Sequence, residues 1–349
     1  MNGFLALEDG SIFRGRSVGA PGVVFGEAVF TTAMSGYQEI ATDPSFAEQL
    51  VCFTAPMIGN YGVTEGRDES DAVSARAVIM RRAGGAEWCR WLVERGTIAL
   101  EDVDTRTLVL TLRERGAMRA GAAAGDASPE AVLDEVRSQP GMAGRALVAA
   151  VSTKSPVRLG SGPLHVGVVD YGCKRSIVRR LVAAGASVTV FPHRATAAEI
   201  LGSRVDGILL SNGPGDPAAL PDEVDVVRDL VGRVPLLGIC LGHQLLGLAL
   251  GFETYKLPFG HRGANHPVLE THSGRVLVTV QNHGFAVAGD GPEVTHRSLY
   301  DETVEGLALP GERARSVQFH PEAAPGPHDA WPIIETWVDE LRENHAKAA

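Results

Sequence analysis

The chain has few cysteines, no excess of basic residues and no long uninterrupted hydrophobic run. Its four cysteines among 349 residues form no C-x-x-C pair. We therefore expect neither a disulfide framework nor a thiolate zinc site, and we expect a cytoplasmic protein. The formal net charge of −10 disfavours electrostatic binding to nucleic acid or to an anionic membrane. The longest apolar stretch, residues 234–252, is interrupted by His243, Gln244 and several glycines, which favours a buried strand and helix over a membrane span.

Two further signals are missing. The N-terminus has no basic region before its apolar residues, so we expect no signal peptide. No G-x-x-x-x-G-K-[ST] sequence occurs in the chain, which argues against an ATP site of its own.

Length and local composition predict two domains. A chain of 349 residues exceeds the usual size of a single domain. Residues 152–164 are rich in serine, glycine and proline, as is typical of a linker. We therefore predict a first domain over residues 1–151 and a second over residues 165–349.

The hydrophobic patterns of the two domains differ. The first predicts an α+β domain with strands at residues 4–7, 11–13 and 23–32 and helices at residues 45–53, 87–95, 106–115 and 128–140. In the second domain short apolar strands alternate with helices, which predicts an α/β fold with a mostly parallel central sheet covered on both faces. After Gly251 the pattern changes to hairpins and loops, with strands at residues 275–280, 285–287 and 316–319 and a closing helix at residues 332–342.

The sharpest chemical pattern is G-I-C-L-G at residues 238–242, between an apolar strand and a helical run. Glycines allow the tight turn that lifts a nucleophile above the sheet, and the following helix N-terminus favours a thiolate at Cys240. A buried structural cysteine is the other interpretation of this pattern alone.

A second pattern, F-H-P-E at residues 319–322, contains a base and a group to orient it. In an extended chain residues two apart project to the same side, so Glu322 would hold one ring nitrogen of His320 while the other faces Cys240. A surface histidine beside a surface glutamate is the alternative interpretation. The apolar residues Val317 and Phe319 favour a buried strand end instead.

The loop Ser211–Pro217 follows a predicted strand, and its glycines would let backbone N–H groups approach a ligand as an oxyanion hole requires. A dinucleotide loop is the rival interpretation, because residues 213–218 fit G-x-G-x-x-A. The proline within the loop and the lack of an acidic residue at the next strand end argue against it.

Weaker patterns occur nearer the C-terminus. Residues 281–285 fit either a small polar pocket or an ordinary turn. His261, His266 and His272 have no carboxylates or thiolates at ligand spacing, so we interpret them as loop histidines and expect no metal.

Together, Gly238–Gln244 and His320–Glu322 make residues 165–349 resemble a class I, or triad, glutamine amidotransferase domain. The first domain resembles the N-terminal domain of the carbamoyl-phosphate synthase small subunit at residues 34–40, 42–45, 58–62 and 104–106. Residues 211–217, 259–267 and 281–287 carry the resemblance through the second domain. It implies an α+β domain followed by an amidotransferase domain that is flavodoxin-like with an α/β-hydrolase-like elbow.

The resemblance also implies roles for particular residues. Cys240 would attack the side-chain amide of L-glutamine, His320 would act as base and then as acid, and Glu322 would orient His320. Water would then resolve the γ-glutamyl thioester. The glutamine contacts that it implies are Ser45, Gly213, Gly215, Leu241, Gln244, Asn282, Gly284 and Phe285.

The family further implies a partner. A large subunit, in a heterodimer or a higher assembly, would use the ammonia with bicarbonate, ATP and Mg to make carbamoyl phosphate for arginine and pyrimidine biosynthesis. No cofactor is expected in this chain. Ser176, where the family commonly has Asn, and a shortened segment at residues 82–87 depart from the family pattern.

Two other function classes stay open. One is a free-standing triad hydrolase of γ-glutamyl substrates, which would not need the first domain. The other is a binding or regulatory protein that has lost catalysis, against which the intact Cys240, His320 and Glu322 count.

Overall fold

The chain divides into two compact units in the structure, a computed structural model that describes residues 2–348. The first unit comprises Met1–Ala143 with Pro258–Gly263, and the second comprises Gly144–Leu257 with Ala264–Ala349. The division differs in two ways from the boundary at residue 151 expected from the sequence: the first unit ends at Ala143, and a later segment returns to it.

Specific contacts explain why Pro258–Gly263 groups with the first unit. The Ala117 N–H donates a hydrogen bond to the Pro258 carbonyl at 2.7 Å, and the Thr32 N–H donates to the Arg262 carbonyl at 3.0 Å. The Phe259 ring stacks on Phe30 with centroids 5.9 Å apart. None of these long-range contacts has a local sequence pattern that would predict it.

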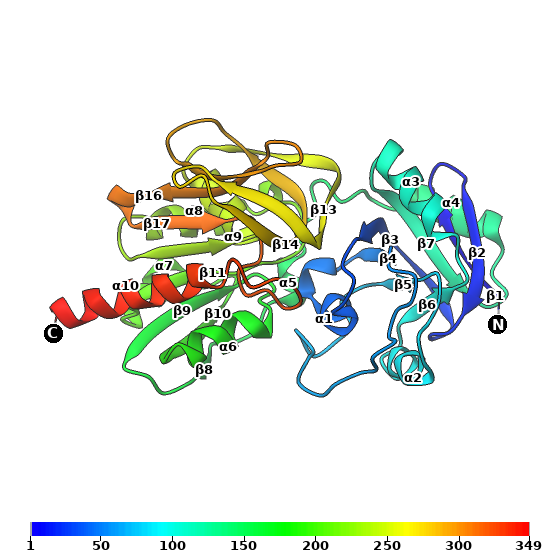
Figure 1. Cartoon of the computed structure of the whole chain (residues 1–349), viewed down its shortest axis with the longest axis horizontal. Coiled ribbons are helices and arrows are strands. Elements are labelled where there is room, and N and C mark those ends of the chain that lie inside the picture. The colour runs from blue at the N-terminus through cyan, green and yellow to red at the C-terminus, as the bar shows by residue number, and fades with distance from the viewer. Residues whose placement is uncertain (1, 349) are drawn as a thin grey trace. The chain divides into compact units, whose positions relative to one another are not determined.

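The strands of the first unit form a closed barrel in the order β1-β2-β6-β5-β4-β3-β7 (Figure 1). Their bounds are β1 Asn2–Leu7, β2 Ile12–Ser17, β3 Gly22–Thr31, β4 Gln49–Phe53, β5 Ala77–Ile79, β6 Ile98–Glu101 and β7 Met118–Ala124. Leu5 on β1 lies opposite Phe13 on β2 and Ala122 on β7. Closure pairs every strand on both sides, so the barrel has no edge strand.

Short helices accompany the barrel, namely α1 Tyr37–Thr42, η1 Pro44–Phe46, α2 Ala86–Glu94, α3 Thr105–Arg115 and α4 Pro129–Ser138. The Asp104 carboxylate caps α3 by accepting a hydrogen bond from the Thr107 N–H at 3.1 Å. The helices expected at residues 87–95, 106–115 and 128–140 are confirmed. The helix expected at residues 45–53 is wrong, because Gln49–Phe53 is a fully buried strand. A short apolar run does not distinguish a buried strand from a helix by its periodicity.

The second unit is built on a mixed sheet in the order β14-β13-β15-β16-β17-β12-β11-β9-β10-β8. Strands β10, β9, β11, β12 and β17 run parallel. The strand bounds are β8 Val157–Leu159, β9 Leu164–Asp170, β10 Ala186–Pro192, β11 Gly207–Leu210, β12 Leu236–Ile239, β13 Glu253–Glu270, β14 Val276–Ala288, β15 Val294–Ser298, β16 Val304–Leu309 and β17 Ala314–Val317. The helix bounds are α5 Val148–Val151, α6 Arg175–Ala183, α7 Ala197–Gly202, η2 Pro217–Ala219, α8 Pro221–Leu230, α9 Leu241–Ala249, η3 Pro310–Glu312 and α10 Pro332–Ala348.

Helices cover both faces of the parallel strands (Figure 1). One buried cluster joins Val168 of β9 to Ile177 of α6 and Trp337 of α10. The cluster on the other face joins Val169 of β9 to Leu230 of α8 and Leu245 of α9. Adjacent residues of β9 thus enter opposite cores, and the predicted parallel sheet with two covered faces is confirmed.

Three details of the second unit differ from the expectation. The segment expected as a linker contains β8, which pairs antiparallel with β10. The two strands expected at residues 275–280 and 285–287 are one continuous strand, β14, and the long strand β13 was not expected. Both β13 and β14 bury polar residues, so apolar alternation does not reveal them.

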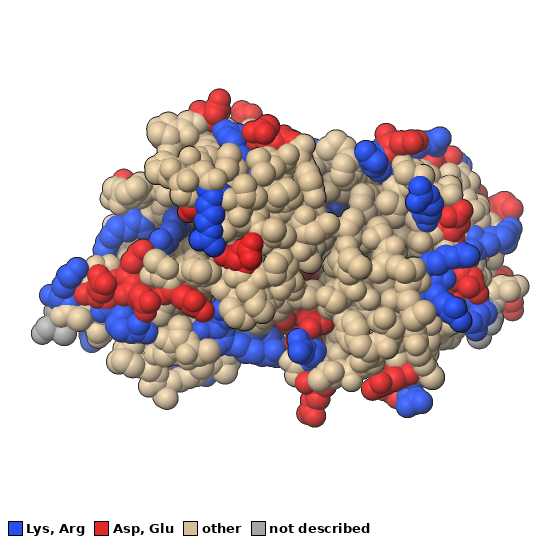
Figure 2. Space-filling view, in the orientation of Figure 1, with Lys and Arg blue, Asp and Glu red and all other residues tan. Residues whose placement is uncertain are grey.

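The surface of helix α10 carries charges of both signs. Acidic and basic side chains lie side by side over α10 (Figure 2). Among the residues that the structure describes, no helix combines the length and apolar character needed to cross a bilayer.

Candidate active site

Cys240 occupies a strained turn between β12 and α9. Its φ is 54° and its ψ is −104°, a backbone conformation that non-glycine residues rarely adopt. The Cys240 N–H donates to the Val317 carbonyl at 2.9 Å, and the Gly242 N–H donates to the Ser211 carbonyl at 2.9 Å. A Cβ at position 242 would lie 2.1 Å from the Leu210 carbonyl oxygen, so only glycine fits there. The ends of β11 and β17 therefore hold the cysteine in its strained position.

His320 and Glu322 come from the segment that follows β17. The His320 N–H donates to the Val280 carbonyl at 2.9 Å, which fixes this segment to β14. The Nδ1 atom of His320 lies 2.7 Å from Oε1 of Glu322, and the two side chains are 1% and 0% exposed. Its Nε2 atom is buried and makes no hydrogen bond of normal geometry within the described part of the chain. The carboxylate thus holds one ring nitrogen and leaves the other for reacting groups.

The charges of this group shift both pKa values. Burial opposes the imidazolium, but the Glu322 carboxylate and the interaction with Cys240 outweigh it and raise the pKa of His320 to about 10. Burial alone would raise the pKa of Glu322, yet the cations of Lys174 and His320 hold it well below its usual range. At neutral pH the site therefore contains a buried imidazolium and carboxylate.

Lys174 is a third charged group in this cluster. Its Nζ atom lies 2.8 Å from Oε1 of Glu322 and donates to the Ala324 carbonyl at 2.7 Å. Its side chain is 3% exposed. It immediately precedes α6, where its own N–H donates to the Asn212 side chain at 3.1 Å. A buried carboxylate facing two cations keeps its charge without help from water.

Strand β14 brings further predicted glutamine contacts to the cysteine. The Asn282 carbonyl accepts from Sγ of Cys240 at 3.6 Å. The Phe285 carbonyl accepts from Nε2 of Gln244 at 2.8 Å. Gly284 lies between Asn282 and Phe285 on strand β14. The structure therefore places Asn282 against Cys240 and Phe285 against Gln244, while the contact of these residues and of Gly284 with glutamine stays a prediction.

The loop after β11 passes close to the turn at Cys240. A Cβ at Gly213 would lie 2.2 Å from the Tyr171 carbonyl oxygen and 2.9 Å from the Leu241 side chain. Gly215 has a φ of 96° and forms a β-bridge with Ala146. The loop leads into the short η2 and not into a long helix, which disfavours the dinucleotide interpretation.

Leu241 supplies a donor suited to an oxyanion. It is the first residue of α9, so its N–H has no acceptor within the helix. The N–H following a nucleophile at such a turn is an expected oxyanion-hole donor.

Ser45 lies in η1 of the first unit. It is buried, and its N–H donates to the Asp43 carboxylate at 2.9 Å. Its predicted contact with glutamine stays a prediction.

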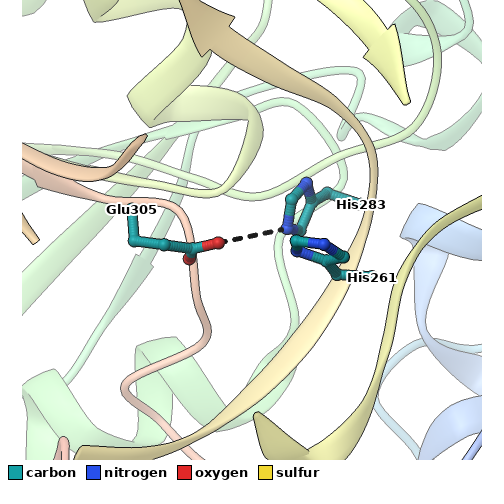
Figure 3. Close-up of side chains that lie close together, drawn as sticks. All are labelled: His261, His283 and Glu305. Carbon is teal, nitrogen blue, oxygen red and sulfur yellow. Dashed lines mark ion pairs between the residues drawn. The ribbon is translucent and has the colours of Figure 1, made fainter. Parts of the chain in front are cut away.

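The polar segment at residues 281–285 belongs to strand β14, so its interpretation as an ordinary turn is wrong. Figure 3 shows His283 directed toward Glu305, with Nε2 of His283 3.9 Å from the carboxylate. Gln281 donates to the other carboxylate oxygen at 2.7 Å, and Nδ1 of His283 lies 2.7 Å from the Phe285 carbonyl oxygen. The buried Glu305 carboxylate therefore has an amide donor at one oxygen and an imidazole near the other.

The interpretation of His261 and His266 as loop histidines is also wrong, because both lie in strand β13 and both are buried. Interspersed polar residues and Pro267 obscure the alternation that would have predicted this strand. His272 does lie in a turn, between β13 and β14, where it is exposed.

Sequence reasoning missed two residues of the site, Lys174 and Gln318. Gln318 is fully buried, and its Oε1 accepts from Nε2 of Gln244 at 3.1 Å. Lys174 had a usable signal, since it follows β9 at the carboxyl edge of the parallel sheet, where ligands of α/β folds bind. Gln318 had none beyond its nearness to His320.

Sequence models of two families match the chain. The model of "Glutamine amidotransferase class-I" matches residues 167–339, and that of "Carbamoyl-phosphate synthase small chain, CPSase domain" matches residues 5–122. The carbamoyl phosphate synthase small chain of Xanthomonas axonopodis pv. citri is 43% identical over 96% of this chain and 97% of its own length. That of Chlorobaculum tepidum is 46% identical over 96% of each chain.

The chain belongs to the carbamoyl phosphate synthase small-chain family. The resemblance found in the sequence is thereby confirmed in both parts of the chain, and the second unit carries the family's class-I glutamine amidotransferase domain. The chain is accordingly an enzyme subunit of the glutamine-hydrolysing type of this synthase.

Solved structures of lower identity were also found. A glutamine amidotransferase of Thermotoga maritima has a TM-score of 0.36 at 19% identity and covers 53% of this chain and 86% of that chain. One of Methylobacillus flagellatus has a TM-score of 0.39 at 16% identity and covers 54% of this chain and 95% of that chain.

Proposed function

We propose that this chain hydrolyses L-glutamine through a Cys240 thioester and delivers the ammonia to a large chain that makes carbamoyl phosphate. The observation that carries the proposal is the buried arrangement of Cys240, His320 and Glu322. A strained cysteine beside an imidazolium whose other nitrogen is held by a carboxylate is suited to nucleophilic catalysis at an amide.

The first half of the reaction releases ammonia. The Cys240 thiolate attacks the side-chain amide carbon of glutamine, and the N–H groups of Leu241 and Gly213 stabilise the oxyanion. The C–N bond then breaks while Nε2 of His320 gives its proton to the departing nitrogen. Ammonia leaves, and a γ-glutamyl thioester remains on Cys240.

The second half regenerates the enzyme. Nε2 of the now neutral His320 takes a proton from water, and the resulting hydroxide attacks the thioester carbon. The C–S bond breaks, glutamate leaves and the thiolate–imidazolium pair returns. Glu322 keeps its contact with Nδ1 throughout, so the ring does not rotate between the two proton transfers.

The substrate pocket would use the residues around the cysteine. Asn282 contacts Cys240, Gln244 follows it in α9 and contacts Phe285, and Gly213 lies in the loop beside Leu241. Gly284 and Gly215 lie in the same strand and loop as these residues. We propose that these residues bind glutamine, and the family resemblance implies a contact of glutamine with Ser45 as well.

The partner is inferred from the chemistry that this chain lacks. Making carbamoyl phosphate from bicarbonate needs ATP and Mg²⁺, and the sequence has no phosphate-binding loop of the Walker type. We propose that ATP and Mg²⁺ bind the large chain of a cytoplasmic heterodimer, or of a higher assembly of it, that feeds arginine and pyrimidine biosynthesis.

Reconstitution tests the proposal. The chain is mixed with the large chain, and carbamoyl phosphate synthesis is measured with glutamine or with ammonium as the nitrogen source. The wild type should support both, whereas Cys240→Ser should lose glutamine-dependent synthesis and keep synthesis from ammonium. Cys89→Ser, in helix α2, is the matched control and should behave as the wild type.

Two results would overturn this assignment. One is glutamine-dependent synthesis that survives Cys240→Ser. The other is steady glutaminase activity of the chain with no effect of the large chain, which would favour a free-standing γ-glutamyl hydrolase.

A further inference from the structure

We propose that Arg180 is a positioning residue for the catalytic triad, which it serves by holding the main chain of Glu322. The inference rests on the proposed function, because it assigns a role in that same reaction. Arg180 lies in α6 and touches neither Cys240 nor the side chain of His320 in any contact that the structure gives.

Arg180 contacts three places in the chain between the triad acid, Glu322, and helix α10. Its Nε donates to the Glu322 carbonyl at 3.3 Å, and its Nη1 lies 3.2 Å from the Glu335 carboxylate in α10. Its guanidinium carbon lies 3.7 Å above the Trp331 ring. One side chain thus contacts the start of the segment 322–331, its end, and the helix that follows.

Trp331 gives the guanidinium a fixed surface. The His328 ring stacks on Trp331 with centroids 3.4 Å apart and an interplanar angle of 21°. Two groups this close to one indole cannot share a face, so Trp331 lies between Arg180 and His328. Guanidinium stacking on an indole is favourable and directional, which restricts the position of the guanidinium.

Helix α6 therefore holds Glu322 at two points. Lys174, which immediately precedes the helix, contacts its carboxylate, and Arg180 contacts its carbonyl. Helices α6 and α10 lie side by side (Figure 1), and the pair of Arg180 with Glu335 links them. The hydrogen bond of 2.7 Å between Glu322 and His320 depends on the position of that backbone. Loss of fixed geometry of this kind lowers the rate of the chemical step more than it weakens substrate binding.

The test measures glutamine hydrolysis by the full chain with and without the large chain. Arg180→Met keeps an unbranched side chain that can pack at this position and removes its charge and donors. We expect kcat to fall about tenfold while KM changes by less than about twofold. Arg180→Lys keeps a cation over Trp331 but not the planar fork, so it should recover part of the loss.

Arg179→Met is the matched control, because Arg179 precedes Arg180 on the same helix and is exposed. It should keep the wild-type kcat. Combining Arg180→Met with Glu322→Gln separates positioning from a general structural effect. If Arg180 acts through Glu322, Arg180→Met should lower kcat by less than about twofold in the Glu322→Gln background.

The proposal is overturned if Arg180→Met keeps the kcat of Arg179→Met. It is also overturned if the tenfold loss persists in the Glu322→Gln background. Should Arg180→Met not fold, Trp331→Leu removes the stacking surface and must show a smaller loss in the same direction, with KM unchanged. A wild-type chain that does not hydrolyse glutamine refutes the proposed function itself, which is a different outcome.

Discussion

Both units bury carboxylates, but they place the opposite charge differently. In the first unit Glu101 pairs with Arg16 and Glu39 with Arg67, and these arginine side chains are 61% and 66% exposed. In the second unit the partners of Glu322 are almost fully buried. An ion pair with an exposed partner changes the free energy of unfolding little. A fully buried ion pair has a high desolvation cost, which only good geometry offsets. Buried charged groups are typical of functional sites, and here they lie beside the candidate nucleophile.

The two buried cysteines should show the largest difference between the units. Cys52 of β4 and Cys240 are both nearly inaccessible, and burial raises the pKa of the Cys52 thiol. We expect iodoacetamide to modify Cys240 at least about 100-fold faster, because only it has an imidazolium beside it. Cys240→Ser should lower glutamine hydrolysis at least about 1,000-fold, whereas Cys52→Ala should stay within about twofold of the wild type.

Peptide mapping of the alkylated protein checks this expectation. Modification of Cys52 at a rate similar to that of Cys240 would remove the distinction between a structural and a reactive buried cysteine.

The next largest difference concerns stability: loss of a buried partner should destabilise the protein more than loss of an exposed one. Lys174→Met leaves the Glu322 carboxylate with one cation fewer in a dry site, which should lower the free energy of unfolding by about 3–5 kcal/mol. Arg16→Met removes a mostly exposed partner of Glu101 and should cost less than about 1 kcal/mol. Urea denaturation of both variants at pH 7 provides the measurement. Equal losses in the two variants would show that burial of the partner does not matter here.

The last comparison concerns pH. The folded-state pKa of His320 is raised to about 10, above its ordinary value of 6.5. Its stabilising contribution is therefore fully present below pH 6.5 and is lost as the pH rises toward 10. Glu322→Gln removes the charge that raises this pKa, so the free energy of unfolding should decline less steeply over this interval. Denaturation at several pH values compares the two slopes, and parallel slopes would contradict the assignment.

The sequence was sufficient where the function depends on short local patterns. Gly238–Gly242 and His320–Glu322 could be read directly, because a tight turn and an extended tripeptide each fix their own geometry. The buried strand Gln49–Phe53 was mistaken for a helix, since its side chains are all buried and give no period of two. Lys174 has only the signal of its place at the carboxyl edge of the sheet, because its partner Glu322 lies 148 residues away in the chain. Interactions of this kind arise from tertiary structure and leave little trace in the local sequence.

The returning segment Pro258–Gly263 has a consequence for synthesis of the protein. Domains generally fold in order as the chain emerges from the ribosome. Here the partners of Thr32 and Ala117 in the first unit are made only after most of the parallel strands of the second unit. The amide groups of Thr32 and Ala117 therefore gain these carbonyl partners only after much of the second unit has been synthesised. A chain released after residue 143 would lack both carbonyl groups.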